Sequence, residues 1–450
     1  MRDMKQGWKW WLATICCLLF VLSACQLQQQ KMGSETEDVS TRVLPSPTVT
    51  ATVGVSATAT VGATATVTKT PTEPAMQTQG IERVHPQVLT TLPPETKLTG
   101  RLILYQSPQY KYVDAGTGRA LGNYPVNFIP DMRVGGGTIS PNKEWVYWGQ
   151  VDVCKRCCEH MVISTSLEKP EIICLDAVWP AYASAYWVND ELLHVQWGNH
   201  DDDGPDRDWL LNPFTKEIQE IGTGEYPAMD DGESSFYGYG RDKFIQFSPD
   251  LKRVVYLRQD KKLVWWDTEH QIVLAERPSN RYTIINAMSI DTWSADIQRW
   301  LSIQMVPQED GWLYELVLTD RDGNLLAETQ AQFDNIYRAF WSPNEEKVAF
   351  IYLEAGEERF AIWDLKTGKV SEYYFEEFMP KTDITKWAFY YEDIFWSPDS
   401  RYVAVQVCPN GWFVEGKIVC TIWLFNPEAG WVVPWFVGDV RLSAWYEPAP

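Results

Sequence analysis

Apolar and polar residues alternate in short runs from about residue 99 onward, and a tight-turn sequence precedes most of these runs. In the turn Trp396-Ser397-Pro398-Asp399-Ser400, the proline fixes φ, and the aspartate and serine side chains can bond back to the backbone. Val403, Val405 and Val407 then fall on one face of an extended segment. The pattern predicts a turn that leads into a half-buried strand.

Equivalent units recur along the chain at intervals of 46 to 60 residues. Their first residues are Ile139, Trp187, Phe247, Trp293, Trp341, Trp396 and Trp445. A second register follows each unit, in which Asp or Asn precedes a further turn, as in Trp363-Asp364 and Trp266-Asp267. Each unit therefore holds about four strands, and a period in this range is typical of propeller blades.

The two ends of the repetitive region complement each other. Only five residues follow Trp445, whereas three strands without an anchor of their own, at 101–106, 110–114 and 119–124, precede the first full unit. We expect the C-terminal strand to be the inner strand of a blade whose other three strands are N-terminal, since such closure leaves no open sheet edge between the ends. The predicted fold is an all-β, seven-bladed β-propeller with this composite closing blade, preceded by a signal peptide and a disordered linker.

The anchor pattern W-S-P-D-x-x-x-V-A resembles the repeats of TolB-type propellers and of related WD-repeat-like propellers. The resemblance covers residues from about 99 to 450 and implies the fold, while it says almost nothing about function. The sequence departs from the pattern at Val188-Asn189 and at Ala295. These departures affect the boundaries of two blades.

The first 24 residues have the pattern of an export signal. Arg2, Lys5 and Lys9 precede a short apolar run, which is followed by Leu22-Ser23-Ala24-Cys25. These four residues match the lipobox of bacterial lipoproteins, which implies cleavage before Cys25 and a lipid on its thiol. The alternative is an uncleaved N-terminal anchor helix. Either interpretation predicts an exported, membrane-anchored protein of the cell envelope.

Residues 25–95 are rich in Thr, Ala, Val, Ser and Pro, and we expect them to form a disordered linker between the lipid anchor and a propeller domain at 96–450. The linker is either a stalk that carries O-linked glycans or a simple spacer. It would hold the propeller away from the membrane.

The composition supports an extensive core, because hydrophobic residues make up 45% of the chain and Trp alone numbers 23. The formal net charge is -21. This charge argues against nucleic acid or anionic lipid headgroups as ligands of the folded part. We expect a monomer that binds an envelope protein or a glycan.

Six cysteines remain besides Cys25 and the two in the signal. Cys408 and Cys420 flank a loop between two strands of one blade, and export favours a disulfide between them. The other four form a separate group, Cys154, Cys157, Cys158 and Cys174. For this group we favour two disulfides; the alternative is a zinc site, since Cys154 and Cys157 have half of the necessary spacing and Cys174 would add a ligand.

The long connections between the predicted strands all fall on one face of the propeller, which we expect to be the recognition face. They are 153–160, 198–208, 222–242, 306–312, 375–393 and 408–416. Aromatic residues in them are candidates to stack on sugar rings or to anchor a protein: Tyr226, Tyr237, Tyr239, Trp412 and Phe413. The alternative role for these rings is packing within their own loops.

One of these loops contains a partial calcium motif. Asn199, Asp201 and Asp203 precede Gly204 with the spacing of the first half of a calcium-binding loop. Leu210 stands where a bidentate glutamate would complete the motif. Calcium is therefore a possible ligand, and a solvated acidic loop is the favoured interpretation.

The sequence contains no nucleophile elbow and no glycine-rich phosphate loop. Its five histidines fall in no recognisable relay. We therefore expect a non-catalytic binding or scaffold module that recognises a protein partner. A glycan-binding propeller is the alternative, and a hydrolase or lyase that works from the central funnel is the third.

Overall fold

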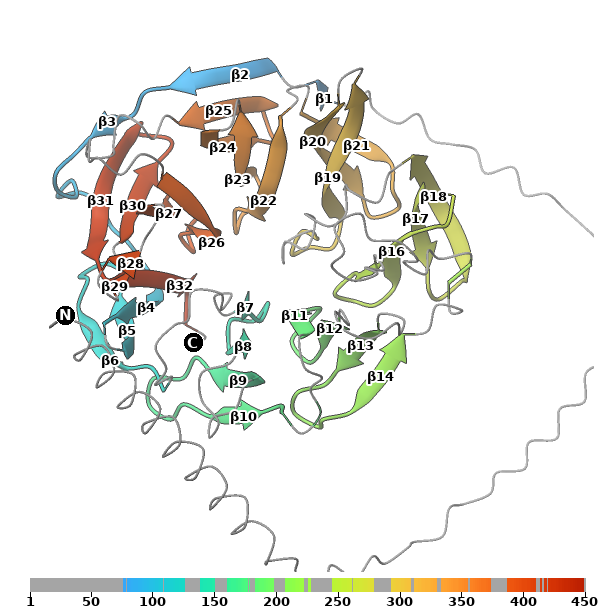
Figure 1. Cartoon of the computed structure of the whole chain (residues 1–450), viewed down its shortest axis with the longest axis horizontal. Coiled ribbons are helices and arrows are strands. Elements are labelled where there is room, and N and C mark those ends of the chain that lie inside the picture. The colour runs from blue at the N-terminus through green and yellow to red at the C-terminus, as the bar shows by residue number, and fades with distance from the viewer. Residues whose placement is uncertain are drawn as a thin grey trace, which may run out of the picture. The chain divides into compact units, whose positions relative to one another are not determined.

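In the computed structural model, seven sheets surround a central axis as the blades of a β-propeller (Figure 1). The structure describes residues 76–77, 79–107, 109–125, 138–149, 160–176, 178, 183–197, 207–221, 226–227, 245–260, 262–278, 293–308, 311–329, 333–354, 357–373, 387–409, 413–414, 417–418 and 420–448. None of these segments forms a helix of the length and apolarity that a bilayer crossing needs. The all-β, seven-bladed architecture predicted from the repeats is confirmed.

The first three blades follow one another along the chain. Blade 1 contains β7 (Thr138–Ile139), β8 (Trp145–Gly149), β9 (His160–Ser164) and β10 (Ile172–Cys174). Blade 2 contains β11 (Ala183–Trp187), β12 (Leu193–Trp197), β13 (Arg207–Leu211) and β14 (Ile218–Ile221). Blade 3 contains β15 (Ile245–Phe247), β16 (Arg253–Leu257), β17 (Lys262–Asp267) and β18 (Ile272–Pro278).

The next three blades continue the same antiparallel order. Blade 4 contains β19 (Arg299–Gln308), β20 (Gly311–Asp320) and β21 (Leu325–Glu328), with Trp293 bridged to Trp300 at its inner edge. Blade 5 contains β22 (Asn335–Trp341), β23 (Lys347–Glu354), β24 (Glu357–Asp364) and β25 (Lys369–Tyr373). Blade 6 contains β26 (Trp387–Trp396), β27 (Val403–Pro409), β30 (Cys420–Asn426) and β31 (Trp431–Gly438), with the hairpin β28 (Phe413–Val414) and β29 (Lys417–Ile418) between its middle strands.

Blade 7 closes the ring and confirms the predicted composite closure. Its inner strand is the C-terminal β32 (Val440–Tyr446), which pairs antiparallel with β4 (Arg101–Gln106); β5 (Gln109–Asp114) and β6 (Ala120–Asn123) complete the sheet. The hydrophobic cores lie between neighbouring blades, and one buried cluster occupies each of the seven junctions. Each sheet is therefore covered on both faces by its neighbours.

The repeated turn owes its shape to its serine. Ser397 Oγ donates a hydrogen bond to Asp399 Oδ1 (2.7 Å) and accepts one from the backbone N–H of Tyr402 (2.9 Å). The residue three positions after the serine has a positive φ, and it is not glycine in any of the five turns that share this geometry: Lys143, Leu251, Ile297, Glu345 and Ser400. A positive φ in such residues costs about 1 kcal/mol each, which the hydrogen bonds of the turn offset.

The N-terminal part of the described chain corrects the predicted linker. Residues 76–88, called the strap below, were assigned to the disordered stretch at 25–95, yet they form strands on the outer edges of three blades (Figure 1). The strap strands β1 (Met76–Gln77), β2 (Gln79–Val84) and β3 (Gln87–Val88) pair in parallel with β21, β25 and β31. Strand addition uses backbone groups of an existing edge, so the strap needs no apolar periodicity of its own. Residues 89–95 of the predicted linker are also described, and Leu89 and Leu92 pack against the core between blades 6 and 7, whereas residues 25–75 lie outside the described residues.

Candidate functional site: the loop face

The connections of the propeller emerge on two opposite faces, because turns alternate sides in an antiparallel meander. On one face, the turn face, are the repeated serine turns and the turns between the third and fourth strands, such as the one from Asp364 to Lys369. The strand ends at the opposite face, the loop face, are those joined by the connections 150–159, 198–206, 222–244, 279–292 and 374–386, of which only Tyr226 and Pro227 belong to the described residues. The difference in length separates a regular face from a variable one.

Hydrogen bonds on the turn face link every pair of neighbouring blades. The bonds, in order around the ring, run from Asn142 to Asp190, Asn189 to Pro249, Arg253 to Asp322, Asp296 to Glu345, Asn344 to Ser400, Arg401 to Lys97 and Tyr112 to Ser166. Their lengths lie between 2.8 and 3.3 Å. These hydrogen bonds join neighbouring blades to one another on the turn face.

The aromatic residues predicted to bind a partner fall into two groups. Tyr226 is buried, and its ring centroid lies 5.5 Å from that of Tyr256, whose hydroxyl donates to the carbonyl of Pro227 (3.1 Å). Tyr226 therefore packs in the core between blades 2 and 3, against a strand of blade 3 and not within its own loop. Tyr237, Tyr239 and Trp412 lie outside the described residues, and Phe413 is described only by its backbone pairing with Ile418 in the β28–β29 hairpin.

The predicted disulfide between Cys408 and Cys420 is confirmed. The S–S distance is 2.06 Å, the Cα atoms are 4.3 Å apart, and both residues are buried. The bond joins β27 to β30 at the base of the connection that carries Trp412 and Phe413. It fixes the two ends of that loop on the loop face.

The other cysteines are described only in part. Cys174 is disulfide-bonded, while Cys154, Cys157 and Cys158 lie outside the described residues. The calcium candidates Asn199, Asp201 and Asp203 lie outside them as well. Within the part of the chain that is described, no group of three or more His, Cys, Asp or Glu side chains is placed to hold a metal ion.

A buried polar cluster in blade 2 was missed by the sequence analysis. His194 on β12 is fully buried, with Tyr186 of β11 at Nδ1 and Asp208 of β13 at Nε2, the latter 3.0 Å from Asp208 Oδ1. An ionised carboxylate can only accept, so Nε2–H of His194 donates to Asp208; in the neutral imidazole, Nδ1 then accepts from the Tyr186 hydroxyl. Burial, followed by the charge of Asp208, raises the pKa of the Tyr186 hydroxyl.

The position of this cluster indicates its role. The ring of His194 also contacts Phe247 of blade 3 edge-to-face, with centroids 5.5 Å apart. The cluster therefore lies in the junction between blades 2 and 3, away from solvent. A histidine relay so placed is suited to fix strand register and blade contact, and a solute does not reach it in this arrangement.

A second histidine lies at the loop-face end of blade 1. His160 begins β9, its Nδ1 is 3.0 Å from the Tyr147 hydroxyl, and its backbone N–H donates to Asp176 Oδ1 (2.9 Å). Burial lowers the pKa of His160 to about 4, against the opposing effect of the Asp176 charge. His160 is therefore neutral at pH 7 in the folded protein.

This pKa predicts a pH dependence of stability. The unfolded chain binds a proton at His160 below about pH 6.5, whereas the folded protein does so only below about pH 4. The unfolded state binds more protons between these values, so stability falls as the pH drops through this window, by up to about 3 kcal/mol. Urea unfolding at pH 7.5, 5.5 and 4.5 should show this component in the wild type and not in His160→Gln. The control is His85→Gln, at an exposed histidine; an unchanged pH profile in His160→Gln would contradict the assignment.

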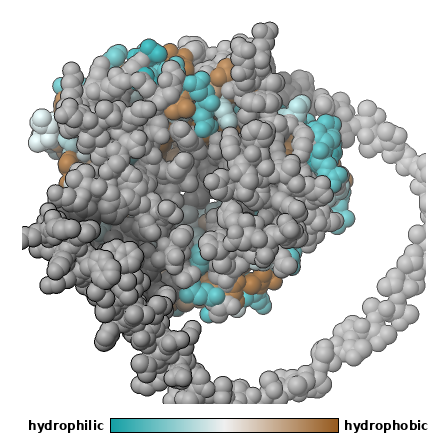
Figure 2. Space-filling model, viewed as in Figure 1, coloured by the Kyte–Doolittle hydropathy of each residue, from teal (hydrophilic) through white to brown (hydrophobic). Residues whose placement is uncertain are grey.

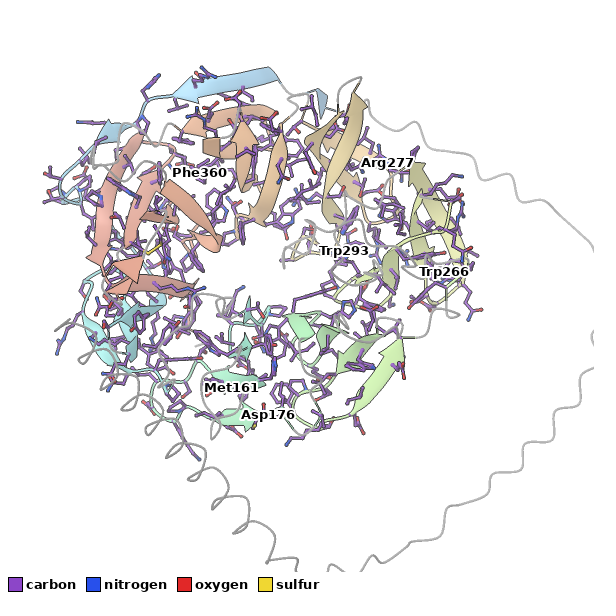
Figure 3. The ribbon with its side chains drawn as sticks, viewed as in Figure 1. Met161, Asp176, Trp266, Arg277, Trp293 and Phe360 are labelled. Atoms are coloured by element: carbon purple, nitrogen blue, oxygen red, sulfur yellow. A yellow bond between two sulfur atoms is a disulfide. The ribbon has the colours of Figure 1, made fainter. Side chains whose placement is uncertain are left out.

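Charged side chains also lie in the junction between blades 3 and 4, where Figure 3 labels Arg277. Arg277 of β18 lies at the edge of blade 3 and interacts with Glu315 of β20 and Glu328 of β21. Burial, and then the charge of Glu328, raises the pKa of Glu315 to about 7. The carboxyl of Glu315 therefore titrates near neutral pH, and its effect on stability is opposite to that of His160: stability decreases as the pH rises from about 4.5 to 7.

The comparisons with known proteins show no family. No family model and no curated protein matches the chain. Among solved structures, the chain is similar to TolB from Acinetobacter baumannii at 14% identity, with 77% of this chain and 82% of that chain covered and a TM-score of 0.36. It is similar to the C-terminal WD40 domain of Sif2 at 12% identity, with 68% and 78% covered and a TM-score of 0.37. The dihydro-heme d1 dehydrogenase NirN is also similar, at 12% identity, with 81% and 79% covered and a TM-score of 0.43.

Proposed function

We propose that the protein is a membrane-anchored, non-catalytic binding module whose loop face recognises a protein partner in the cell envelope. The observation that carries the proposal is the asymmetry of the two faces. The turn face is linked from blade to blade at all seven junctions by hydrogen bonds of its own residues. The long connections, which differ from blade to blade, all emerge on the opposite face.

The connection between β27 and β30 is the favoured anchor within that face. It contains Trp412 and Phe413, and the Cys408–Cys420 bond holds its ends 4.3 Å apart at Cα. A loop fixed at its base loses less conformational entropy on binding than a free one. Aromatic residues on such loops are the side chains that most often carry binding energy in protein interfaces.

The proposal is tested by affinity capture from the native envelope, with the full-length protein as bait. We expect a specific protein to be retained by the wild type and lost when Trp412 and Tyr237 are both changed to alanine. The matched control is Lys366→Ala, at an exposed position of the turn face. Retention of the same proteins by all three baits, or of none by the wild type, would refute the proposal. A glycan that raises the melting temperature in a parallel panel would favour the glycan-binding alternative instead.

A further inference from the structure

The strap meets three neighbouring blade junctions at the rim of the propeller. Ile81 packs against the core between blades 4 and 5, and Val84 packs against the core between blades 5 and 6. Just beyond the strap, Leu89 and Leu92 pack against the core between blades 6 and 7. One continuous segment therefore runs along the rim from blade 4 to blade 7 and adds an apolar side chain at each junction that it crosses (Figure 1).

Charged side chains add to the backbone pairing of β2 with β25. Arg83 lies between two carboxylates: its Nε is 3.7 Å from Glu372 Oε2, and its Nη2 is 3.6 Å from Glu354 Oε2. Glu82 forms an ion pair with Lys369, and both of these side chains are exposed. In Figure 2, hydrophilic and hydrophobic residues lie side by side along the upper rim, where Figure 1 places β2. The strap is thus held by half-buried apolar residues and by ion pairs at the surface.

The strap is held less firmly than the strand that closes the ring. Of residues 81–88, only Pro86 is buried, whereas all seven residues of β32 are buried. Exposed ion pairs contribute about 1 kcal/mol or less each. A segment with few buried contacts opens locally at a much lower free energy than the whole domain unfolds. We therefore expect the strap to detach while the blades stay folded.

The order of the strands decides which contacts a pull on the N-terminal segment loads first. A pull from residues 1–75 enters the strap at Met76 and passes β1, β2 and β3, on blades 4, 5 and 6, before it reaches blade 7. In blade 7 it would act on Arg101, the first residue of β4, which pairs with Tyr446 at the end of β32. A strand that is pulled at its end loses its pairs one after another. Such a pull would therefore open the composite blade from this point.

We propose that the strap is a strain relief, which transfers a pull on the N-terminal segment to blades 4–6 and so keeps it off the composite seventh blade. The source of the pull is the membrane anchor of the proposed function, on which this part of the inference rests. Under a stronger pull, the strap detaches from β1 onward and lengthens the tether before the β4–β32 pair is loaded. It pairs again when the pull ends, because its acceptor strands belong to blades that remain folded.

The test applies the pull directly, so its result does not depend on the anchor or on a partner. Optical tweezers hold the full-length protein by two unnatural amino acids, one in place of Glu73, just before the strap, and one in place of Glu191, an exposed residue of blade 2. We expect a first transition that is reversible and occurs at low force. It should lengthen the molecule by at most about 100 Å, since residues 73–100 extend by at most about 3.6 Å each. The larger steps of blade unfolding follow at higher force.

Glu82→Lys places a second positive charge against Lys369 and is expected to make the first transition about threefold or more faster at a fixed load. Adding Lys369→Glu restores the ion pair with its charges exchanged, and the wild-type rate should return. Both positions are exposed, so the melting temperature, which is measured first, should change little. The matched control is Glu269→Lys, which reverses the charge of the exposed partner of Lys252 on blade 3 and should leave the first transition unchanged.

The proposal is overturned if the first transition already opens blade 7, which a lengthening well above about 100 Å would show. It is also overturned if Glu82→Lys leaves the first transition unchanged, if Lys369→Glu does not restore it, or if Glu269→Lys accelerates it equally. An affinity capture that retains no partner would refute the proposed function and leave this order of events untouched.

Discussion

Removal of residues 439–450 is expected to abolish cooperative folding of the propeller, whereas removal of only 447–450 is expected to leave it intact. The longer deletion removes β32, all seven of whose residues are buried. Val440, Leu442 and Trp445 belong to the core between blades 6 and 7, and Ala444 and Tyr446 to the core between blades 7 and 1. One strand therefore contributes to two of the seven junctions.

The magnitude of this effect follows from the buried side chains. Each large apolar side chain contributes about 1.5–3 kcal/mol on burial, so four of them contribute about 6–12 kcal/mol. A typical domain has a net stability of about 5–15 kcal/mol. Urea unfolding followed by tryptophan fluorescence and near-UV circular dichroism measures the loss. A truncated protein with the wild-type transition would contradict the role of β32 in closure.

Asp208→Ala is expected to destabilise the protein by about 2–4 kcal/mol. The variant leaves the ring nitrogen of the fully buried His194 without its acceptor and creates a cavity in the junction between blades 2 and 3. The measurement is the free energy of unfolding in urea at pH 7.5, with the slope of the transition compared between variants.

Asp208→Asn is the matched control for this prediction. It keeps the size of the side chain and an oxygen that accepts the hydrogen bond from His194, so its loss should be less than half that of the alanine variant. Equal losses in the two variants would mean that the hydrogen bond does not matter. A loss below about 1 kcal/mol in Asp208→Ala would contradict the structural role of the cluster.

The blade count and the closure were predictable from the sequence because both depend on local turns and their spacing. In five of the seven anchors, a serine bonds to residues two and five positions away, as Ser397 does to Asp399 and Tyr402. Such short-range geometry repeats visibly in a sequence. The composite blade was predictable because a C-terminal strand without partners and three N-terminal strands without an anchor together make one four-stranded blade.

The strap and the histidine cluster were not predictable because they depend on pairing between distant segments. Arg83 lies beside Glu372 only because β2 adds to β25. Likewise, His194 contacts Tyr186 and Asp208 only because three strands pair in this register, and the sequence of a single strand does not determine that register. The aromatic residue assigned to binding that the structure does describe in full, Tyr226, shows a related problem: ring type alone does not distinguish a packed residue from an exposed one.

The composite seventh blade also dictates the order in which the chain folds. The indole N–H of Trp445 donates to the carbonyl of Thr99 across a sequence separation of 346 residues. Because a chain is synthesised from its N-terminus, the strands β4 to β6 are made before blades 1–6 and remain without their inner partner until β32 is made. We therefore expect blades 1–6 to assemble in turn and ring closure to be the final, slow step, as contacts of such separation are the slowest to form. Until then, the exposed edge of β4 is open to strands of other molecules.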